Sequence, residues 1–100
     1  MSLSNERKKY LREIGHSLKP VVTSAAKGLS DTVLQELNRA LEDHELIKVK
    51  LQVEDKIATV QLLCEASHSE LVQSIGNIVL IYRAATKPNP KISNLLKNNA

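Results

Sequence analysis

A short loop between a predicted strand and a predicted helix holds the residues of this sequence best suited to binding chemistry. It reads Ala25-Ala26-Lys27-Gly28. A helix N-terminus presents unpaired N–H groups with a partial positive charge, and Lys27 adds a full charge beside it. Because Ala25, Ala26 and Gly28 are small, the backbone of a polynucleotide can come close. The combination is typical of a site that holds a phosphate.

The same loop also has a purely structural interpretation. Asp31 places a negative charge in the first turn of the helix, where it satisfies the helix dipole and weakens the attraction for an anion. Gly28 would then only supply a backbone angle that other residues avoid. On the local residues alone, this plain strand-to-helix turn is the slightly better interpretation.

A second cationic feature lies on the predicted first helix, which follows the N-cap candidate Ser4. Its apolar side is formed by Tyr10, Leu11, Ile14 and Leu18. At 100° per residue, its basic residues share another arc with no acid inside it, and they are Lys8, Lys9, Arg12 and His16. This arc is either a solvated helix face or a binding strip beside the core, and the sequence favours neither.

Four further cations are candidates for the same kind of contact, namely Lys19, Lys48, Lys50 and Arg83. Lys48 and Lys50 lie on the polar side of the strictly alternating segment LIKVKLQVE, which predicts a half-buried strand. These two lysines either contact a polyanion or keep the sheet soluble. Lys19 stands before a proline at the end of the first helix, and Arg83 begins a basic C-terminal stretch.

The charge of the chain is divided along its length. The net charge is only +3, yet residues 1–28 carry six Lys or Arg against two acids, residues 29–82 four against nine, and residues 83–100 four against none. Basic ends that meet in space favour a polyanionic partner such as RNA, DNA or an anionic surface. The alternative is ordinary surface charge.

Several functional classes have no support in the sequence. No apolar run reaches the roughly 18 residues of a membrane span, and the N-terminus lacks the apolar core of a secretory signal. Cys64 is the single cysteine, so it forms no internal disulfide, and the three histidines show no metal-ligand spacing. No catalytic motif is present. We therefore expect a cytoplasmic, non-enzymatic protein without metal, cofactor or small-molecule substrate, and a monomer as the simplest oligomeric state.

The helices and strands that position these residues can be predicted from the periodicity of apolar residues and from the glycines and prolines that interrupt it. The predicted order is α-β-α-β-α-β-β, over residues 4–16, 20–24, 31–43, 46–54, 56–67, 70–75 and 78–82. Strand-helix-strand order favours parallel pairing, and the Gly76-Asn77 turn favours an antiparallel last pair. The fold class is therefore mixed α/β, with a small mixed sheet in one domain, residues 1–86, and a basic tail, residues 87–100.

The scarcity of aromatic residues limits how the protein can bind a nucleic acid. The chain has no Trp or Phe, and its two tyrosines, Tyr10 and Tyr82, stand at unrelated positions. A sheet that stacks bases on aromatic rings is therefore not expected. Binding should depend mainly on phosphates and shape.

Several separate motifs, in order along the chain, resemble the CRM-domain family, named for chloroplast RNA splicing and ribosome maturation. The resemblance is greatest to its bacterial stand-alone branch, the YhbY-like proteins, and extends from about Ser4 to Ser93. The residues that carry it are Leu18-Lys19-Pro20-Val21-Val22, Lys27-Gly28-Leu29, Val33-Leu34, HELIKVK from His44 to Lys50, Ile75-Gly76, Leu80-x-Tyr82-Arg83 and Lys91-Ile92-Ser93.

The resemblance implies a fold, a ligand and a site. It implies a four-stranded mixed sheet like that of the C-terminal domain of translation initiation factor three, RNA binding, and association with precursors of the large ribosomal subunit. It also implies that the G-x-x-G loop of the family maps onto Ala25-Ala26-Lys27-Gly28. Ala25 replaces the first glycine, and because alanine disfavours positive φ, the clamp takes another shape if that angle is needed.

Two other functional hypotheses remain open from the sequence. A protein-interaction module could dock on a ribosomal protein or assembly factor through acids around the second helix, which are Glu36, Glu42, Asp43 and Glu45. A small nuclease would rest only on acids and histidines that the sequence does not bring together.

Overall fold

The fold contains three helices and four strands in the parts of the chain that the structure, a computed structural model, describes, residues 4–24 and 30–86. In chain order they are α1 (Asn5–Gly15), β1 (Pro20–Ser24), α2 (Asp31–His44), β2 (Leu46–Leu51), α3 (Lys56–Ser67), β3 (Glu70–Ile75) and β4 (Ile78–Tyr82). The predicted order of elements is confirmed. The predicted loop at residues 25–28 and the predicted tail, 87–100, lie outside the described residues.

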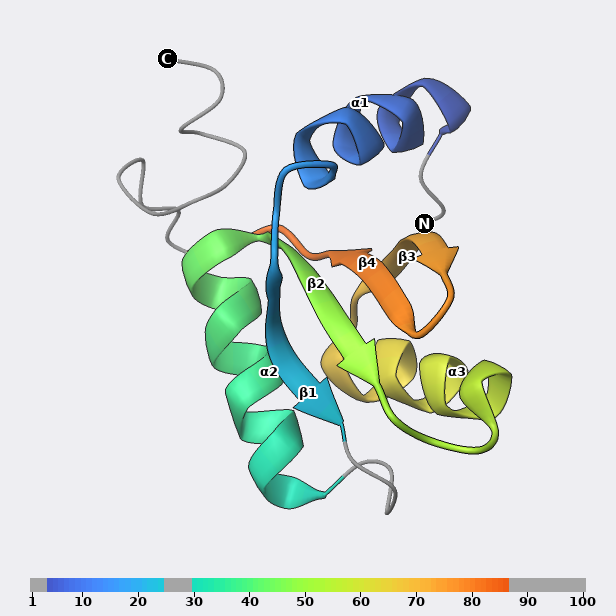
Figure 1. Cartoon of the computed structure of the whole chain (residues 1–100). Coiled ribbons are helices and arrows are strands. Elements are labelled where there is room, and N and C mark those ends of the chain that lie inside the picture. Colours follow the sequence, from blue (N-terminus) through green and yellow to red (C-terminus); the bar gives the residue numbers. More distant parts are fainter. Residues whose placement is uncertain (1–3, 25–29, 87–100) are drawn as a thin grey trace.

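The strands form one mixed sheet in the order β1-β2-β4-β3. β1 runs parallel to β2, whereas β4 is antiparallel to both of its neighbours, β2 and β3 (Figure 1). The expected parallel first pair and antiparallel last pair are confirmed. The pairing register shifts in both edge strands, between Pro20 and Val22 in β1 and between Leu71 and Gln73 in β3.

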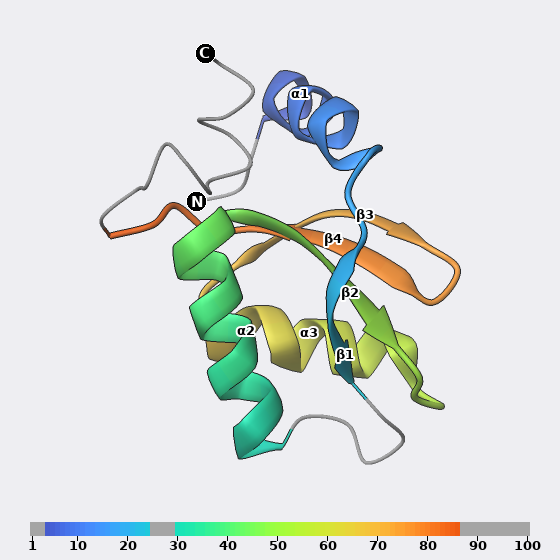
Figure 2. The same ribbon diagram turned by 60° about the vertical axis from the view of Figure 1, so that its left-hand side comes forward.

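The main core lies between one face of the sheet and the pair of helices α2 and α3. Strand residues Ile47, Val49 and Ile81 are almost fully buried there, together with Leu37 from α2 and Leu63 from α3. Figure 2 shows both helices on this side of the sheet and α1 on the other. The alternation in β2 is thus explained by a fully covered face.

A smaller core holds α1 against the opposite face of the sheet. Leu11 is fully buried with Leu46, Val72 and Leu80, as the apolar side of the first helix predicts. Gly15 allows this contact, because a Cβ there would lie 2.6 Å from the Leu80 Cδ2 atom. α1 crosses only one end of the sheet (Figure 1), and the described residues leave the rest of this face uncovered.

Capping residues set where the helices begin and end. The hydroxyls of Ser4 and Ser30 accept hydrogen bonds from the third residue beyond, so both predicted N-caps are confirmed. α2 runs one residue past its predicted end, to His44, and stops because Glu45 takes a positive φ of 64°. Such an angle cannot continue a right-handed helix.

Removing the side chain that fastens α1 should destabilise the domain. We expect Leu11→Ala to lower the free energy of unfolding by about 2–5 kcal/mol, because it deletes buried methyl groups and leaves a cavity. Urea unfolding followed by circular dichroism measures this. The control is Leu62→Ala, since Leu62 is also helical but 58% exposed. Equal, small effects for the two variants would contradict the packing of α1.

Candidate nucleic-acid interface

A groove between α1 and β3 is edged by three of the four basic residues predicted on the first helix. Its lining residues are Lys9, Arg12, Glu13, His16, Gln73 and Ile75. The fourth predicted cation, Lys8, is half-buried and does not line this groove. Glu13 places one acid among the cations, so the strip is basic on balance rather than uniformly.

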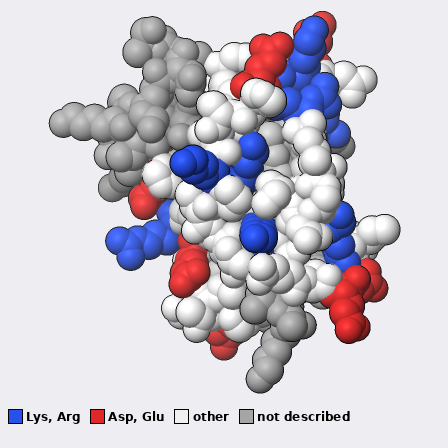
Figure 3. Space-filling view, viewed as in Figure 1, with Lys and Arg blue, Asp and Glu red and all other residues white. Residues whose placement is uncertain are grey.

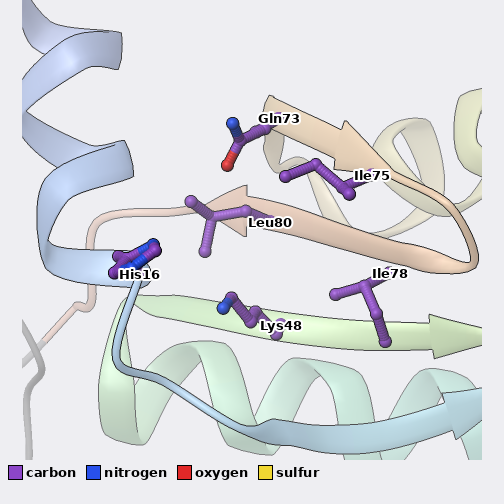
Figure 4. A pocket seen from close by; sticks show the side chains of 6 residues that line it. All are labelled: His16, Lys48, Gln73, Ile75, Ile78 and Leu80. Atoms are coloured by element: carbon purple, nitrogen blue, oxygen red, sulfur yellow. The ribbon is translucent and has the colours of Figure 1, made fainter.

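A second hollow adjoins this groove where the end of α1 meets the sheet (Figure 4). It has a volume of about 180 Å³ and is lined by His16, Lys48, Gln73, Ile75, Ile78 and Leu80. His16, Gln73 and Ile75 line both depressions, so the two are continuous. Lys48 from β2 and His16 from α1 thereby share one site, although they are far apart in the sequence.

The basic residues of α1 and β2 form one surface, which we call the cationic face, and its members are Lys9, Arg12, His16, Lys48 and Lys50. Lys50 is exposed on the same side of β2 as Lys48, roughly 7 Å further along the strand. Figure 3 shows Lys and Arg side chains over both α1 and the sheet, with acidic side chains beside α1 and toward the edges of the view. The two predicted sets of cations are therefore brought together.

The cationic face leads toward the predicted phosphate loop. Lys50 pairs in register with Thr23, one residue before the end of β1. The basic residues of α1 do not adjoin the described residues on either side of this loop, because α1 lies at the opposite end of β1 from its last residue and from the start of α2 (Figure 1). The half-buried Lys48 and the exposed Lys50 lie on the strand between the two ends. The loop residues Ala25, Ala26, Lys27 and Gly28 lie outside the described residues, so their role stays a prediction.

Two other predicted cations, Lys19 and Arg83, are not part of the cationic face. Lys19 is exposed in the link between α1 and β1. Arg83 is committed to the fold, because its guanidinium donates hydrogen bonds of 2.8 Å to the Asn38 side chain and the Ser67 carbonyl oxygen, and of 3.0 Å to the Asn38 carbonyl oxygen. It also lies 3.7 Å from Glu42. We therefore assign Arg83 to holding α2, α3 and β4 together.

Two of the acidic residues predicted as a protein-docking surface, Glu42 and Glu45, make contacts within the domain. Glu45 is buried, and its carboxylate accepts a hydrogen bond from the N–H of Ala85. Glu42 accepts one from the N–H of Thr86 and faces Arg83. These carboxylates fasten the chain that follows β4, which leaves a smaller acidic surface for a protein partner.

The rings of the two tyrosines both lie within cation–π distance of Arg7. The Arg7 guanidinium lies 5.2 Å from the centre of the Tyr10 ring and 5.7 Å from that of Tyr82. Both distances are in the range of cation–π contacts. The arrangement explains why the rings are spaced so irregularly in the sequence, and it agrees with binding that does not depend on stacked aromatics.

The remaining reactive groups show no catalytic arrangement in the ranges 4–24 and 30–86. Cys64 packs beside the main core, and burial is the chief cause that raises the pKa of its thiol, while Ser69 opposes this and Glu70 adds to it. A raised pKa keeps the thiol neutral and unreactive. No cluster of metal-ligating side chains occurs among the described residues, and no helix there is long and apolar enough to cross a membrane.

Residues 3–83 match the model of the CRS1/YhbY (CRM) domain family, so the chain belongs to this family. A probable RNA-binding protein of Pseudomonas aeruginosa is 52% identical over 98 residues, which cover 95% of this chain and 94% of the relative. The probable RNA-binding protein YqeI of Bacillus subtilis is 36% identical over 93 residues, covering 90% and 96%.

A solved structure agrees with the fold described above. It is the solution structure of a hypothetical protein from Staphylococcus aureus, which superposes with a TM-score of 0.75 at 34% sequence identity and covers 91% of this chain and 97% of that one. The family resemblance and the four-stranded mixed sheet expected from it are thus confirmed.

Sequence reasoning missed four lining residues of the hollow, Gln73, Ile75, Ile78 and Leu80. They lie on β3 and β4, and none of them carries a charge that would mark it as a binding residue. A weak signal was available, since Ile75 and Ile78 flank the Gly76-Asn77 turn and must therefore face each other.

Removal of Arg83 should weaken the fold. We expect Arg83→Ala to lower the free energy of unfolding by about 1–3 kcal/mol, because the carbonyl oxygens of Asn38 and Ser67 lose a charged donor. Arg83→Lys should recover only part of this loss, since an ammonium group lacks the planar fork. Chemical denaturation measures both, with the exposed Lys50→Ala as the control. If Arg83→Ala had the same free energy of unfolding as the wild type, the structural role assigned to Arg83 would be wrong.

Proposed function

We propose that the protein binds RNA through the cationic face and the loop at residues 25–28, mainly by contacts to phosphates. The observation that carries the proposal is the meeting of cations from α1 and β2 on the face of the sheet that α2 and α3 leave uncovered. Several relatives in the same family bear the name of RNA-binding proteins, which supports this class of ligand.

Phosphate contacts are the mode of binding that these side chains suit best. Lys and Arg on an open surface neutralise phosphates and release counterions, which gives an affinity that falls steeply with salt. Lys27, with the small residues around it, would add backbone N–H donors at the start of α2. Such contacts fix where the RNA lies without reading its sequence.

We infer that the RNA is ribosomal RNA in a precursor of the large subunit, and that the protein acts there without catalysis. The motifs shared with the YhbY-like branch support this role. An open face that grips structured RNA by its phosphates suits a protein that holds one conformation of a precursor. We place this activity in the cytoplasm and expect a monomer.

Charge reversal on the cationic face should weaken RNA binding. We expect Lys50→Glu to lower the affinity for a structured ribosomal RNA fragment and to reduce the slope of log affinity against log salt by about 1, because one phosphate contact is lost. Lys27→Glu should act in the same direction. Fluorescence anisotropy at several salt concentrations measures both effects.

The matched control for this experiment is Arg39→Glu. Arg39 is also exposed but lies on α2, on the other side of the sheet, and the substitution changes the net charge equally. If Lys50→Glu and Arg39→Glu weakened binding to the same extent, the RNA would be responding to total charge. The cationic face would then not be the binding surface.

The proposed role in assembly predicts where the protein sediments. In sucrose gradients of cell extract at low salt, we expect it with large-subunit precursors, and raised salt should release it to the top fractions because the contacts are electrostatic. Immunoblotting of each fraction measures this. A protein found only in the top fractions at low salt would refute the ribosomal role.

A further inference from the structure

An exposed apolar pair lies within the otherwise polar part of the open sheet face. Ile75 and Ile78 are opposite each other in the register of β3 and β4. Ile75 is 64% exposed, and Ile78 is half-buried. Single exposed isoleucines are ordinary on protein surfaces. This pair differs because it forms part of the wall of the hollow that His16 and Lys48 also line.

One end of the hollow is apolar, and polar groups border the other. Figure 4 shows Ile75 and Ile78 on the side of the β3–β4 turn, and the polar ends of Gln73 and Lys48 with the His16 ring on the side of α1. The buried Leu80 lies between Gln73 and Lys48. Its volume is about 180 Å³. An apolar cavity of about 150 Å³ accommodates benzene, so a single six-membered ring fits the available space.

The chemistry of this lining matches that of a nucleotide. A base has an apolar flat face, which Ile75 and Ile78 can cover, and a polar edge, which the Gln73 amide can meet because it both donates and accepts hydrogen bonds. The phosphate beside that base would lie near Lys48. The adjoining groove, with Lys9 and Arg12, would take the next part of the backbone.

We propose that this hollow receives one unpaired RNA base that projects from a helix whose phosphates lie on the cationic face. The inference rests on the proposed RNA binding and adds a preference to it. A base inside an A-form duplex cannot reach the hollow, because both of its faces are stacked and one of its edges lies in a deep, narrow major groove. A bulged or flipped-out base exposes both the face and the edge that the lining residues suit.

Three RNA hairpins of the same stem test the inference. One carries a single-nucleotide bulge, the second is fully paired, and the third has an abasic residue at the bulge. Fluorescence anisotropy with the full chain at one salt concentration should show about tenfold tighter binding of the bulged hairpin, since removing a base face and the two isoleucines from water contributes an energy of this order. The abasic hairpin should bind like the paired one.

Substitutions locate the preference on the protein. Ile75→Ser should lower the affinity for the bulged hairpin about fivefold and leave the paired hairpin unchanged, because the phosphate contacts stay. The matched control is Ile57→Ser, since Ile57 is 75% exposed but lies on α3, across the sheet. Lys50→Glu should weaken all three complexes alike. Circular dichroism checks that each variant is folded.

The outcomes separate this inference from the proposed function. Equal affinity of the wild-type chain for all three hairpins, with a steep salt dependence, would overturn the base site and keep RNA binding by phosphates. A bulge preference that Ile75→Ser and Ile57→Ser retain equally would also overturn the site in the hollow. Failure to bind any of the hairpins at low salt would overturn both proposals.

Discussion

The close contact between the end of α1 and Leu80 is the constraint on which the candidate surface depends. Gly15 leaves room for the Leu80 side chain where any other residue would place a Cβ within 2.6 Å. The helix therefore sits low on the sheet, and His16 comes to line the same hollow as Lys48. A larger residue at position 15 would require either the Leu80 side chain or this end of α1 to shift. A shift of α1 would move His16 relative to Lys48.

Some charged residues in this domain form contacts within the fold, whereas others are exposed to solvent. Arg83, Glu42 and Glu45 are each hydrogen-bonded to the backbone, Arg83 and Glu42 also form an ion pair, and the two carboxylates fasten the chain after β4. On the open face, by contrast, Lys9, Arg12 and Lys50 are exposed. A buried or well-bonded charge is costly to remove and contributes to folding, whereas an exposed one contributes little to stability and is available to a ligand. The small net charge of the chain therefore understates how basic one face is.

Periodicity predicted the elements well because it reports which side of an element is buried. The bounds of β1, α3, β3 and β4 agree with the prediction residue for residue. β2 ends at Leu51, although the alternation continues to residue 54, because β1 ends beside it at Ser24. Strand order depends on partners far away in the chain, so the position of β4 between β2 and β3 could not be predicted from the pattern of residues alone. For the same reason, the sequence indicated His16 and Lys48 as candidates but not the other residues that line the hollow with them, Gln73, Ile75, Ile78 and Leu80. It also grouped Arg83 with the RNA-binding candidates, whereas the structure gives this side chain Asn38 and Ser67 as partners.

The register shifts in the two edge strands have a consequence for how the protein behaves when crowded. A regular edge offers a row of N–H and C=O groups to any other strand, and such edges promote aggregation. Here each edge is interrupted, near Pro20 in β1 and near Gln73 in β3. Proline also removes one N–H donor from the first edge. Interrupted edges of this kind disfavour edge-to-edge pairing between copies of the chain, although one broad face of the sheet stays open.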